Sequence, residues 1–307
     1  MFRIIKDTNI DFIGLRRKAF VLSGILILIG LAALTMVLLN KANMGIDFEG
    51  GTMIQGNFAE PINVSDLRSA IAAGGFPEAS IVALHQHGVT NAYMIRVKET
   101  TAGEEKAADK LKNIIASQFP DNHFTRDSEH TIGPAVGDSL KTSARWAVLI
   151  SVLGMIAYIG VRFDFRSGVA ATVATFHDVL AVLGIFWIFN IEINLLAVTA
   201  LLTIAGYSLT DTVVIYDRIR ENLKKFRKKG EFVPSVNRSI NEVLSRTLMT
   251  SLSTLLVVIT LYIFGGEVLK DFSLAMILGV IIGTYSSIFV ASPIVVEWEA
   301  RFPRRFK

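Results

Sequence analysis

Asp211 is the residue of this chain best placed to do chemistry, because it lies inside the long apolar run 193–216. An ionised carboxylate in membrane hydrocarbon is so costly that an acid there almost always faces a bundle interior or a water-filled path. Asp211 precedes Asp217, at the polar end of the run, by six residues, which is about 9 Å along a helix. Proton handling is the leading interpretation of this position, and pairing with a neighbouring helix for structure alone is the alternative.

A second acid sits beside a histidine in another apolar run, 167–189, where His177 and Asp178 are adjacent. Neighbouring residues point about 100° apart on a helix, so at least one of the two side chains must face away from lipid. Because histidine titrates near neutral pH, a proton relay from this pair to Asp211 is one interpretation. A hydrogen-bonded pair that serves structure is the other, and the sequence leaves both open.

Arg246 opens the apolar run 247–266 on the membrane side where the Asp211 run ends. A guanidinium stays charged, so its approach would lower the proton affinity of Asp211 and its departure would raise it. An anchor that snorkels to lipid phosphate is the alternative, and without further information it is the stronger interpretation.

The motif GIDFEGG at residues 45–51 directly follows the first apolar run. Gly45, Gly50 and Gly51 permit backbone angles that other residues avoid, and Asp47 lies between them. The motif is interpreted either as a hinge that transmits bundle movement to the segment beyond it or simply as a required turn. It has neither the lysine nor the spacing of a phosphate-binding loop.

Two further segments are predicted to serve packing and topology. Gly279 and Gly283 have the small-xxx-small spacing that lets helices approach closely, within the bundle or against a partner. The basic cluster at 224–229 is interpreted mainly as a determinant of topology, with contact to anionic membrane lipid or to a translocon as the second interpretation.

Other chemistries fit the sequence poorly. The chain has no cysteine, which excludes disulfides and thiol catalysis. His85 and His87 could share a strand face, but no carboxylate or cysteine spacing accompanies them, so no metal site is predicted. No nucleophile, base and acid form a recognisable set, so neither an enzyme activity nor a cofactor is predicted. The net charge of +4 comes from basic residues that flank apolar runs, and nucleic-acid binding is not expected.

Six apolar runs long enough to cross a membrane place these residues in a polytopic α-helical membrane protein. The hydrophobic fraction of 51% and the mean hydropathy of +0.49 exceed those of soluble proteins. The predicted spans are 19–39, 146–161, 167–189, 193–216, 247–266 and 272–296. The second is only sixteen residues long, so it either spans thinly or is extended by the polar turn before it.

Charge asymmetry predicts the orientation. The short loops 190–192 and 267–271 hold Lys270 as their only basic residue, whereas twenty Lys and Arg lie in 1–18, 162–167, 217–246 and 299–307. Both tails, 1–18 and 298–307, and the basic loop 217–246 are therefore predicted to be cytoplasmic. Residues 40–145 are predicted to lie outside. The first span is too long for a signal peptide and is expected to remain as an anchor.

The outside segment is predicted to be an α+β ferredoxin-like domain. Its expected order is β-α-β-β-α-β, with elements at 52–58, 64–73, 80–85, 92–98, 104–119 and 124–132. Asn63 is expected to cap the first helix, and Thr101 with Glu104 forms a capping box for the second.

Three motifs spread along the chain resemble the SecF family, the smaller membrane subunits of the SecD–SecF accessory complex of the bacterial Sec translocon. They are GIDFEGG at 45–51, DTVVIYDRIREN at 211–222 and SRTLMTS at 245–251. The resemblance implies a partner, a SecD-like six-span subunit, in an assembly similar to resistance-nodulation-division transporters. It also implies work with the SecYEG translocon on a translocating polypeptide in the cytoplasmic (inner) membrane. By the same resemblance Asp211 is a proton-path residue and Arg246 its partner.

The predicted function is that of a non-enzymatic subunit that uses the proton-motive force to promote protein translocation. One alternative is half of a small-molecule proton-coupled transporter, although such halves normally carry a much larger outside domain. A passive membrane assembly scaffold is the other, and it predicts that removing the charge of Asp211 leaves function intact. The choice between H⁺ and Na⁺ as coupling ion is left open.

Overall fold

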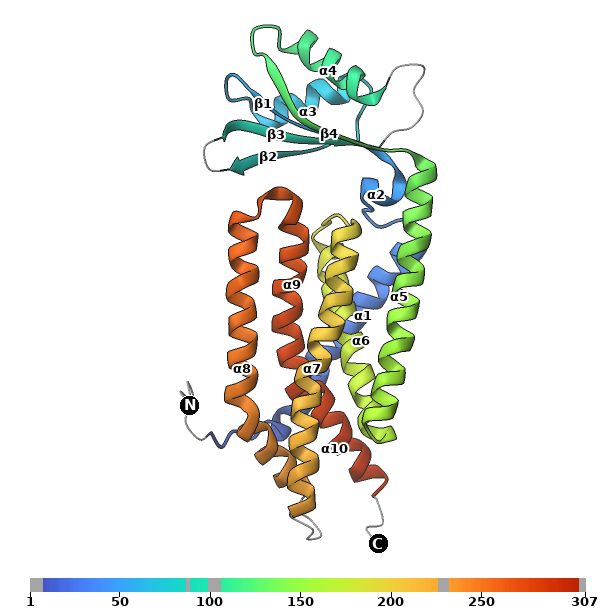
Figure 1. Cartoon of the computed structure of the whole chain (residues 1–307), viewed down its shortest axis with the longest axis vertical. Helices are drawn as coiled ribbons and strands as arrows, with labels where there is room; N and C mark the ends of the chain where they lie inside the picture. Colours follow the sequence, from blue (N-terminus) through green and yellow to red (C-terminus); the bar gives the residue numbers. More distant parts are fainter. Residues whose placement is uncertain (1–7, 87–88, 99–105, 226–231, 304–307) are drawn as a thin grey trace.

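The computed structural model describes residues 8–86, 89–98, 106–225 and 232–303, and it places an α+β domain on one end of a long helical bundle (Figure 1). Six helices within these ranges are long and apolar enough to cross a membrane, which confirms the predicted number of spans. The α+β domain is inserted between the first and the second of them. The bundle end next to this domain is called the outer end below, and the opposite end the inner end.

The spanning helices cover the predicted apolar runs to within two residues at each end, and most extend beyond them at one end or both. They are α1 (Arg16–Leu38), α5 (Pro134–Arg162), α6 (Phe165–Ile188), α7 (Leu195–Lys225), α8 (Phe232–Phe264) and α9 (Gly266–Ser286), which continues into α10 (Ser292–Arg301). The predicted run 146–161 is only the apolar half of α5. This helix begins at Pro134, where the missing N–H of proline leaves no helical hydrogen bond unmade. The polar residues before Trp146 are thus helical and lengthen the short span.

The α+β domain has the predicted element order. It contains β1 (Gly51–Phe58), α3 (Val64–Ala73), β2 (Ser80–Gln86), β3 (Val89–Val97), α4 (Ala107–Gln118) and β4 (Phe124–Ile132). The strands form an antiparallel sheet in the order β2-β3-β1-β4, which confirms the ferredoxin-like prediction. The Asn63 side chain caps α3 by accepting a hydrogen bond from the Ser65 N–H at 3.1 Å. The predicted capping box at Thr101 and Glu104 lies outside the described residues, as do His87 and residues 226–229 of the basic cluster.

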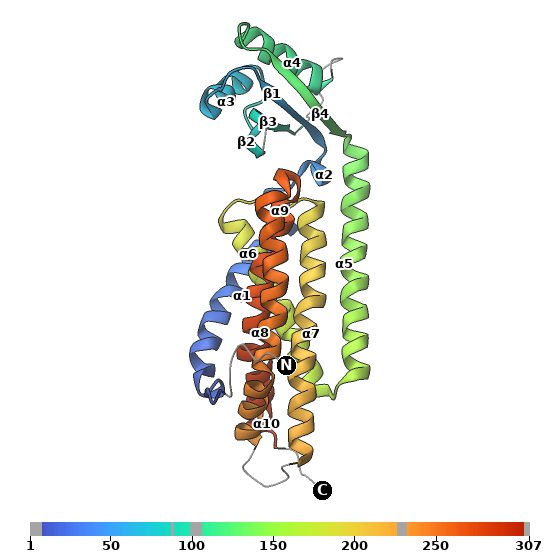
Figure 2. The same ribbon diagram turned by 60° about the vertical axis from the view of Figure 1, so that its left-hand side comes forward.

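Alternating side chains of the sheet build two small cores. Ile54 and Ile95 point to the face covered by α3 and α4, where they pack with Leu67, Leu111 and other apolar residues. Met94, the neighbour of Ile95 in β3, points to the opposite face, where it packs with Leu84 and Ala92. The outer end of α9 contacts β2. The sheet therefore rests on the bundle with one face and carries its helices on the other (Figure 2).

The bundle has central helices, which are mostly buried, and peripheral helices, which are mostly exposed. Most of α6 and of the α9–α10 unit is buried, whereas α1, α5 and α8 leave most of their apolar surface exposed. On α5 the exposed apolar side chains include Trp146, Ile150 and Val161. Exposed apolar surface of this extent is expected to face lipid or another membrane protein.

A π-helical segment, Ser287–Ala291, joins α9 to α10. Such π-helical turns are rare and are frequently found at functional sites. The Tyr216 hydroxyl on α7 donates a hydrogen bond to the Ala291 carbonyl at 2.9 Å, and the Ser292 hydroxyl donates to the Ser287 carbonyl five residues earlier. Beyond the segment, α10 carries two acids that pair with the inner ends of other helices, Glu297 with Arg16 and Glu299 with Arg166.

Candidate functional site

Asp211 lies on α7 and is only 6% exposed. Its Oδ2 atom is buried and has no hydrogen-bond partner among the described residues. A buried carboxylate without full hydrogen bonding is costly, and such groups are few in native structures. The carboxylate therefore faces the protein interior, as an acid in a membrane span is expected to do.

The polar surroundings of Asp211 come from α8. Ser251 and Arg246 on that helix are the side chains that interact electrostatically with the carboxylate. The Ser251 hydroxyl also shares a hydrogen bond of 2.6 Å with Thr284 of α9 and accepts a longer one, 3.4 Å, from Tyr207 of α7. Asp211 thus borders a polar seam where α7, α8 and α9 meet.

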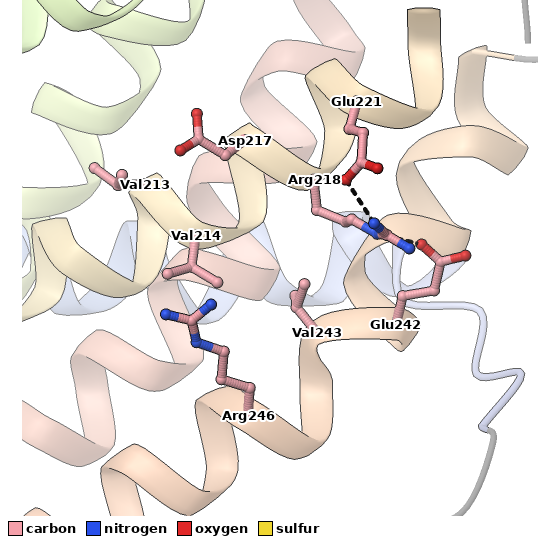
Figure 3. Close-up of a pocket in the computed structure, with 8 residues that line it drawn as sticks. All are labelled: Val213, Val214, Asp217, Arg218, Glu221, Glu242, Val243 and Arg246. Atoms are coloured by element: carbon pink, nitrogen blue, oxygen red, sulfur yellow. Dashed lines mark hydrogen bonds and ion pairs between the residues drawn. The ribbon is translucent and has the colours of Figure 1, made fainter. Parts of the chain in front are cut away.

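Arg246 stands at the rim of a pocket of about 550 Å³ at the inner end of α7 and α8 (Figure 3). The other lining residues are Val213, Val214, Asp217, Arg218, Glu221, Glu242 and Val243. Figure 3 shows the Arg246 side chain directed toward Val214, while Arg218 reaches Glu221 and Glu242. Asp217 is paired with Arg162 of α5. The lining acids are thus largely engaged by other arginines.

Within the described ranges, Arg246 makes no ion pair with any carboxylate, Asp211 included. The two residues predicted as partners therefore lie on the adjacent helices α7 and α8, and no ion pair joins them in the described chain. An unpaired guanidinium beside a buried acid can approach or withdraw without breaking another ion pair.

His177 and Asp178 are completely enclosed in the middle of α6. The His177 Nδ1 atom lies 2.8 Å from Asp178 Oδ1, and Asp178 Oδ2 accepts hydrogen bonds from the hydroxyls of Ser208 and Ser286. His177 Nε2 is buried without a partner in the described chain, and its ring lies 6.4 Å from that of Tyr285. Both side chains face inward, and three helices supply their contacts.

Ser208 brings the Asp178 cluster close to Asp211 along α7. Ser208 and Asp211 are three positions apart on this helix, a rise of about 4.5 Å. No direct hydrogen bond joins Asp178 to Asp211 in the described chain. Ser208, which bonds to Asp178, therefore lies one turn of α7 before Asp211, but no continuous chain of hydrogen bonds joins the two acids in the described chain.

Gly279 and Gly283 hold α9 close to α7 at this level. A Cβ atom on Gly279 would come within 2.3 Å of the Ile204 side chain, and one on Gly283 within 3.1 Å of Ser208 Cβ. The close approach lets Ser286, one turn further along α9, reach Asp178. Both glycines of α9 therefore pack within the bundle, against α7, the helix that carries Asp211.

Sequence reasoning missed the hydroxyls of Ser208, Ser251 and Ser286. All three lie in apolar runs and are buried. Serine is common in membrane helices, where it can bond to its own backbone, so its presence alone indicates no site. The usable signal was that Ser208 and Ser251 lie within two turns of Asp211 and Arg246.

The GIDFEGG motif forms the junction between α1 and the sheet and contains the short helix α2 (Ile46–Glu49). Gly50 and Gly51 have φ angles of 80° and 142°, which favour glycine. The Asp47 carboxylate accepts a hydrogen bond from the N–H of Leu195, the first residue of α7, at 2.9 Å. Gly45 N–H donates to the Ile193 carbonyl just before α7. The junction thus contacts the start of the helix that carries Asp211, a contact the sequence did not indicate.

No group of three or more His, Cys, Asp or Glu side chains that could hold a metal ion occurs in the described part of the chain.

Comparison with known proteins places this arrangement in a family. Residues 111–301 match the family model described as protein export membrane protein SecD/SecF, C-terminal. The chain is 47% identical over 298 residues to the protein translocase subunit SecF of Thermodesulfovibrio yellowstonii, covering 96% of this chain and 97% of that protein. It is 39% identical over 306 residues to the SecF subunit of Endomicrobium trichonymphae, covering 99% and 96% respectively.

A solved structure has the same architecture. The crystal structure of SecDF from Thermus thermophilus, a translocon-associated membrane protein, superposes with a TM-score of 0.81 at 37% identity. The match covers 96% of this chain but only 39% of the longer SecDF chain. This chain is therefore similar to one part of that protein.

Proposed function

The chain belongs to the SecD/SecF family of protein export membrane proteins, whose SecF subunits are non-enzymatic parts of the translocase, and from this premise we propose that it couples proton movement to protein export. In this role it assists translocation across the bacterial cytoplasmic membrane together with a SecD-like six-span subunit, the SecYEG translocon and the translocating polypeptide. Its multi-pass fold and the names of its relatives support this proposal.

The observation that carries the proposal is the buried Asp211 carboxylate with an unpartnered oxygen. A fixed structural acid would be expected to have both oxygens bonded. An acid that exchanges a proton spends part of its cycle neutral, and a neutral carboxyl group is far cheaper to bury. The polar seam with Ser251 and Thr284 supplies groups that can bond either form.

Arg246 is proposed to tune this exchange from the inner end. Its guanidinium has no ion-pair partner in the described chain, and the pocket beside it opens at that end of the bundle. Movement of α8 relative to α7 changes the distance between the guanidinium and Asp211, and with it the affinity of the carboxyl group for a proton. The inner end is proposed to be cytoplasmic, as the positive-inside rule predicts.

His177 and Asp178 are proposed to act as a second, enclosed stage of the pathway. Their hydrogen bonds to Ser208 and Ser286 reach α7 and α9, and Ser208 precedes Asp211 by one turn. His177 Nε2 has no partner among the described residues and so can accept or release a proton without displacing a bond.

The junction at Gly45, Asp47, Gly50 and Gly51 is proposed as the hinge that carries bundle movement to the α+β domain. The positive φ angles of Gly50 and Gly51 permit rotation there, and Asp47 holds the start of α7. The exposed apolar faces of α1, α5 and α8 are proposed to contact lipid and the SecD-like partner.

The test is the variant Asp211→Asn, assayed in membrane vesicles for precursor export that depends on the ion gradient. The amide is neutral and close in size, so folding and partner binding are expected to persist while gradient-dependent export falls to background. Asp217→Asn is the matched control, since Asp217 lies on the same helix but is paired at the rim. Normal gradient dependence in Asp211→Asn would favour the scaffold alternative. Imposing H⁺ and Na⁺ gradients separately identifies the coupling ion.

A further inference from the structure

A largely buried ion pair joins the α+β domain to the loop between α6 and α7. Arg96 on β3 places its Nη1 atom 2.5 Å from Glu192 Oε2, and the two side chains are only 16% and 15% exposed. The other carboxylate oxygen, Oε1, lies beside Gly45, where a Cβ atom would come within 2.6 Å of it. Glu192 thus touches both the sheet and the junction.

This ion pair closes a triangle of contacts at the outer end. Lys98, the residue after β3, pairs with Glu49 of α2 at 2.6 Å. Asp47 of α2 accepts the hydrogen bond from the Leu195 N–H at the start of α7. Glu192, just before α7, pairs with Arg96 of β3. The strand, the junction helix and the start of α7 are therefore each bound to the other two.

The loop is also bound firmly to the bundle. Asn194 is 9% exposed, and its Oδ1 atom accepts a hydrogen bond from the Ala197 N–H in the first turn of α7 at 2.8 Å. Its amide nitrogen donates to Asp271 of α9 at 2.9 Å. A displacement of the start of α7 therefore moves the loop with it.

Asp211 lies on this same helix, sixteen residues beyond Leu195, or about 24 Å along its axis. A continuous helix transmits tilt along its length because its backbone hydrogen bonds keep it stiff. A glycine hinge alone permits the α+β domain to rotate but does not determine which way it turns. A second contact away from Gly50 and Gly51, the two residues with positive φ, is needed to impose a direction, and Arg96–Glu192 is such a contact.

We propose that the Arg96–Glu192 ion pair is a strut that, with the glycine hinge, makes the α+β domain follow the tilt of α7. Arg96 and Glu192 are positioning residues in this scheme, since neither contacts Asp211. The inference rests on the proposed function, because it requires that Asp211 drives movement of α7. A largely buried ion pair suits this place because it fixes one register between two bodies, whereas apolar packing of similar area would be as stable but less specific.

The test compares charge reversals by two readouts in the same vesicles, gradient-driven precursor export and gradient-driven proton flux. Arg96→Glu and Glu192→Arg each place like charges together, and the double variant restores an opposite pair. Arg126→Glu and Glu129→Arg are matched controls, since that pair lies on β4 of the same domain and does not reach the bundle. The cysteine-free chain also permits Arg96→Cys with Glu192→Cys, joined by a short reducible bis-thiosulfonate linker.

Each single reversal is expected to lower export by about tenfold while proton flux stays within about twofold of wild type, and the double reversal recovers most of the export. The linker is expected to restore export to the double-cysteine variant, and its reduction to abolish it again. Wild-type export in the single variants, or loss of proton flux in parallel with export, would overturn the strut. So would failure of both the double reversal and the linker to restore export. Absence of any gradient dependence in wild-type vesicles would instead overturn the proposed function, and the strut with it.

Discussion

The Ser208 hydroxyl donates a hydrogen bond to the Asp178 carboxylate and thereby ties the middle of α6 to the turn of α7 that precedes Asp211. Ser286 donates to the same oxygen from α9. Three helices thus meet on one buried acid, and none of the three contributes a lysine or an arginine to it. The carboxylate depends on hydroxyl groups and on His177 for its hydrogen bonds.

The first prediction concerns these hydroxyls. Ser208→Ala removes one donor from the enclosed Asp178 carboxylate and is expected to cost about 1–3 kcal/mol of stability, because the oxygen is left less well bonded away from water. Ser286→Ala should cost a similar amount. The measurement is thermal unfolding of the purified protein in detergent.

The control for this prediction is Ser253→Ala. Ser253 lies on the exposed side of α8 and bonds only to backbone carbonyls. Its replacement is expected to change stability by less than about 0.5 kcal/mol. Equal effects at Ser208 and Ser253 would mean that the Asp178 carboxylate does not rely on its serine donors.

The second prediction concerns helix packing. Gly279→Ala inserts a methyl group 2.3 Å from the Ile204 side chain and is expected to cost about 1–3 kcal/mol through overpacking. Gly154→Ala is the control, because nothing lies within 4 Å of its Cβ position on α5. It should be neutral or stabilise the helix by up to about 1 kcal/mol. Comparable losses of melting temperature in both variants would contradict the close approach of α9 to α7.

The third prediction concerns Arg246. Arg246→Lys keeps the charge but loses the planar guanidinium, so gradient-dependent export should fall, and Arg246→Ala should lower it further. The measurement is the export assay in vesicles, and Arg220→Lys on the exposed side of α7 is the matched control. If lysine and alanine at 246 both support wild-type export, Arg246 is a lipid anchor and not a partner of Asp211.

The fourth prediction concerns orientation. Because the chain has no cysteine, single cysteines at Lys112 in α4 and at Lys224 near the end of α7 can be labelled without background. A membrane-impermeant maleimide applied to intact cells should label position 112 only, and applied to inverted vesicles position 224 only. The reverse pattern would invert the proposed topology and exclude the export role as stated.

Much of the fold could be predicted from the sequence because its signals are local. The edges of β4 coincide with the predicted run 124–132, and Asn63 caps α3 as its position before an apolar-periodic segment indicated. Asp211 and the His177–Asp178 pair stood out because charge in an apolar run is rare. These features need only residue types and their spacing.

The contacts that join distant segments could not be predicted in this way. Glu192 is an ordinary polar loop residue in the sequence, and only the fold brings Arg96 to it from almost a hundred positions away. The polar first half of α5 has no apolar periodicity, so its helix is recognised only by the proline that begins it. The π-helical turn at Ser287–Ala291 lies in an apolar stretch whose composition is equally compatible with a regular α-helix.

The π-helical segment Ser287–Ala291 determines the rotation of α10 about its own axis. One residue more or less in a helix rotates the remainder by about 100°, so α10 presents Glu297 and Glu299 to Arg16 and Arg166 only while the turn keeps its extra residue. If the turn tightened to a regular helix, both acids would swing away from the helices they now hold. The backbone conformation of Ser287–Ala291 therefore determines whether α10 can hold the inner ends of α1 and α6 through these two ion pairs.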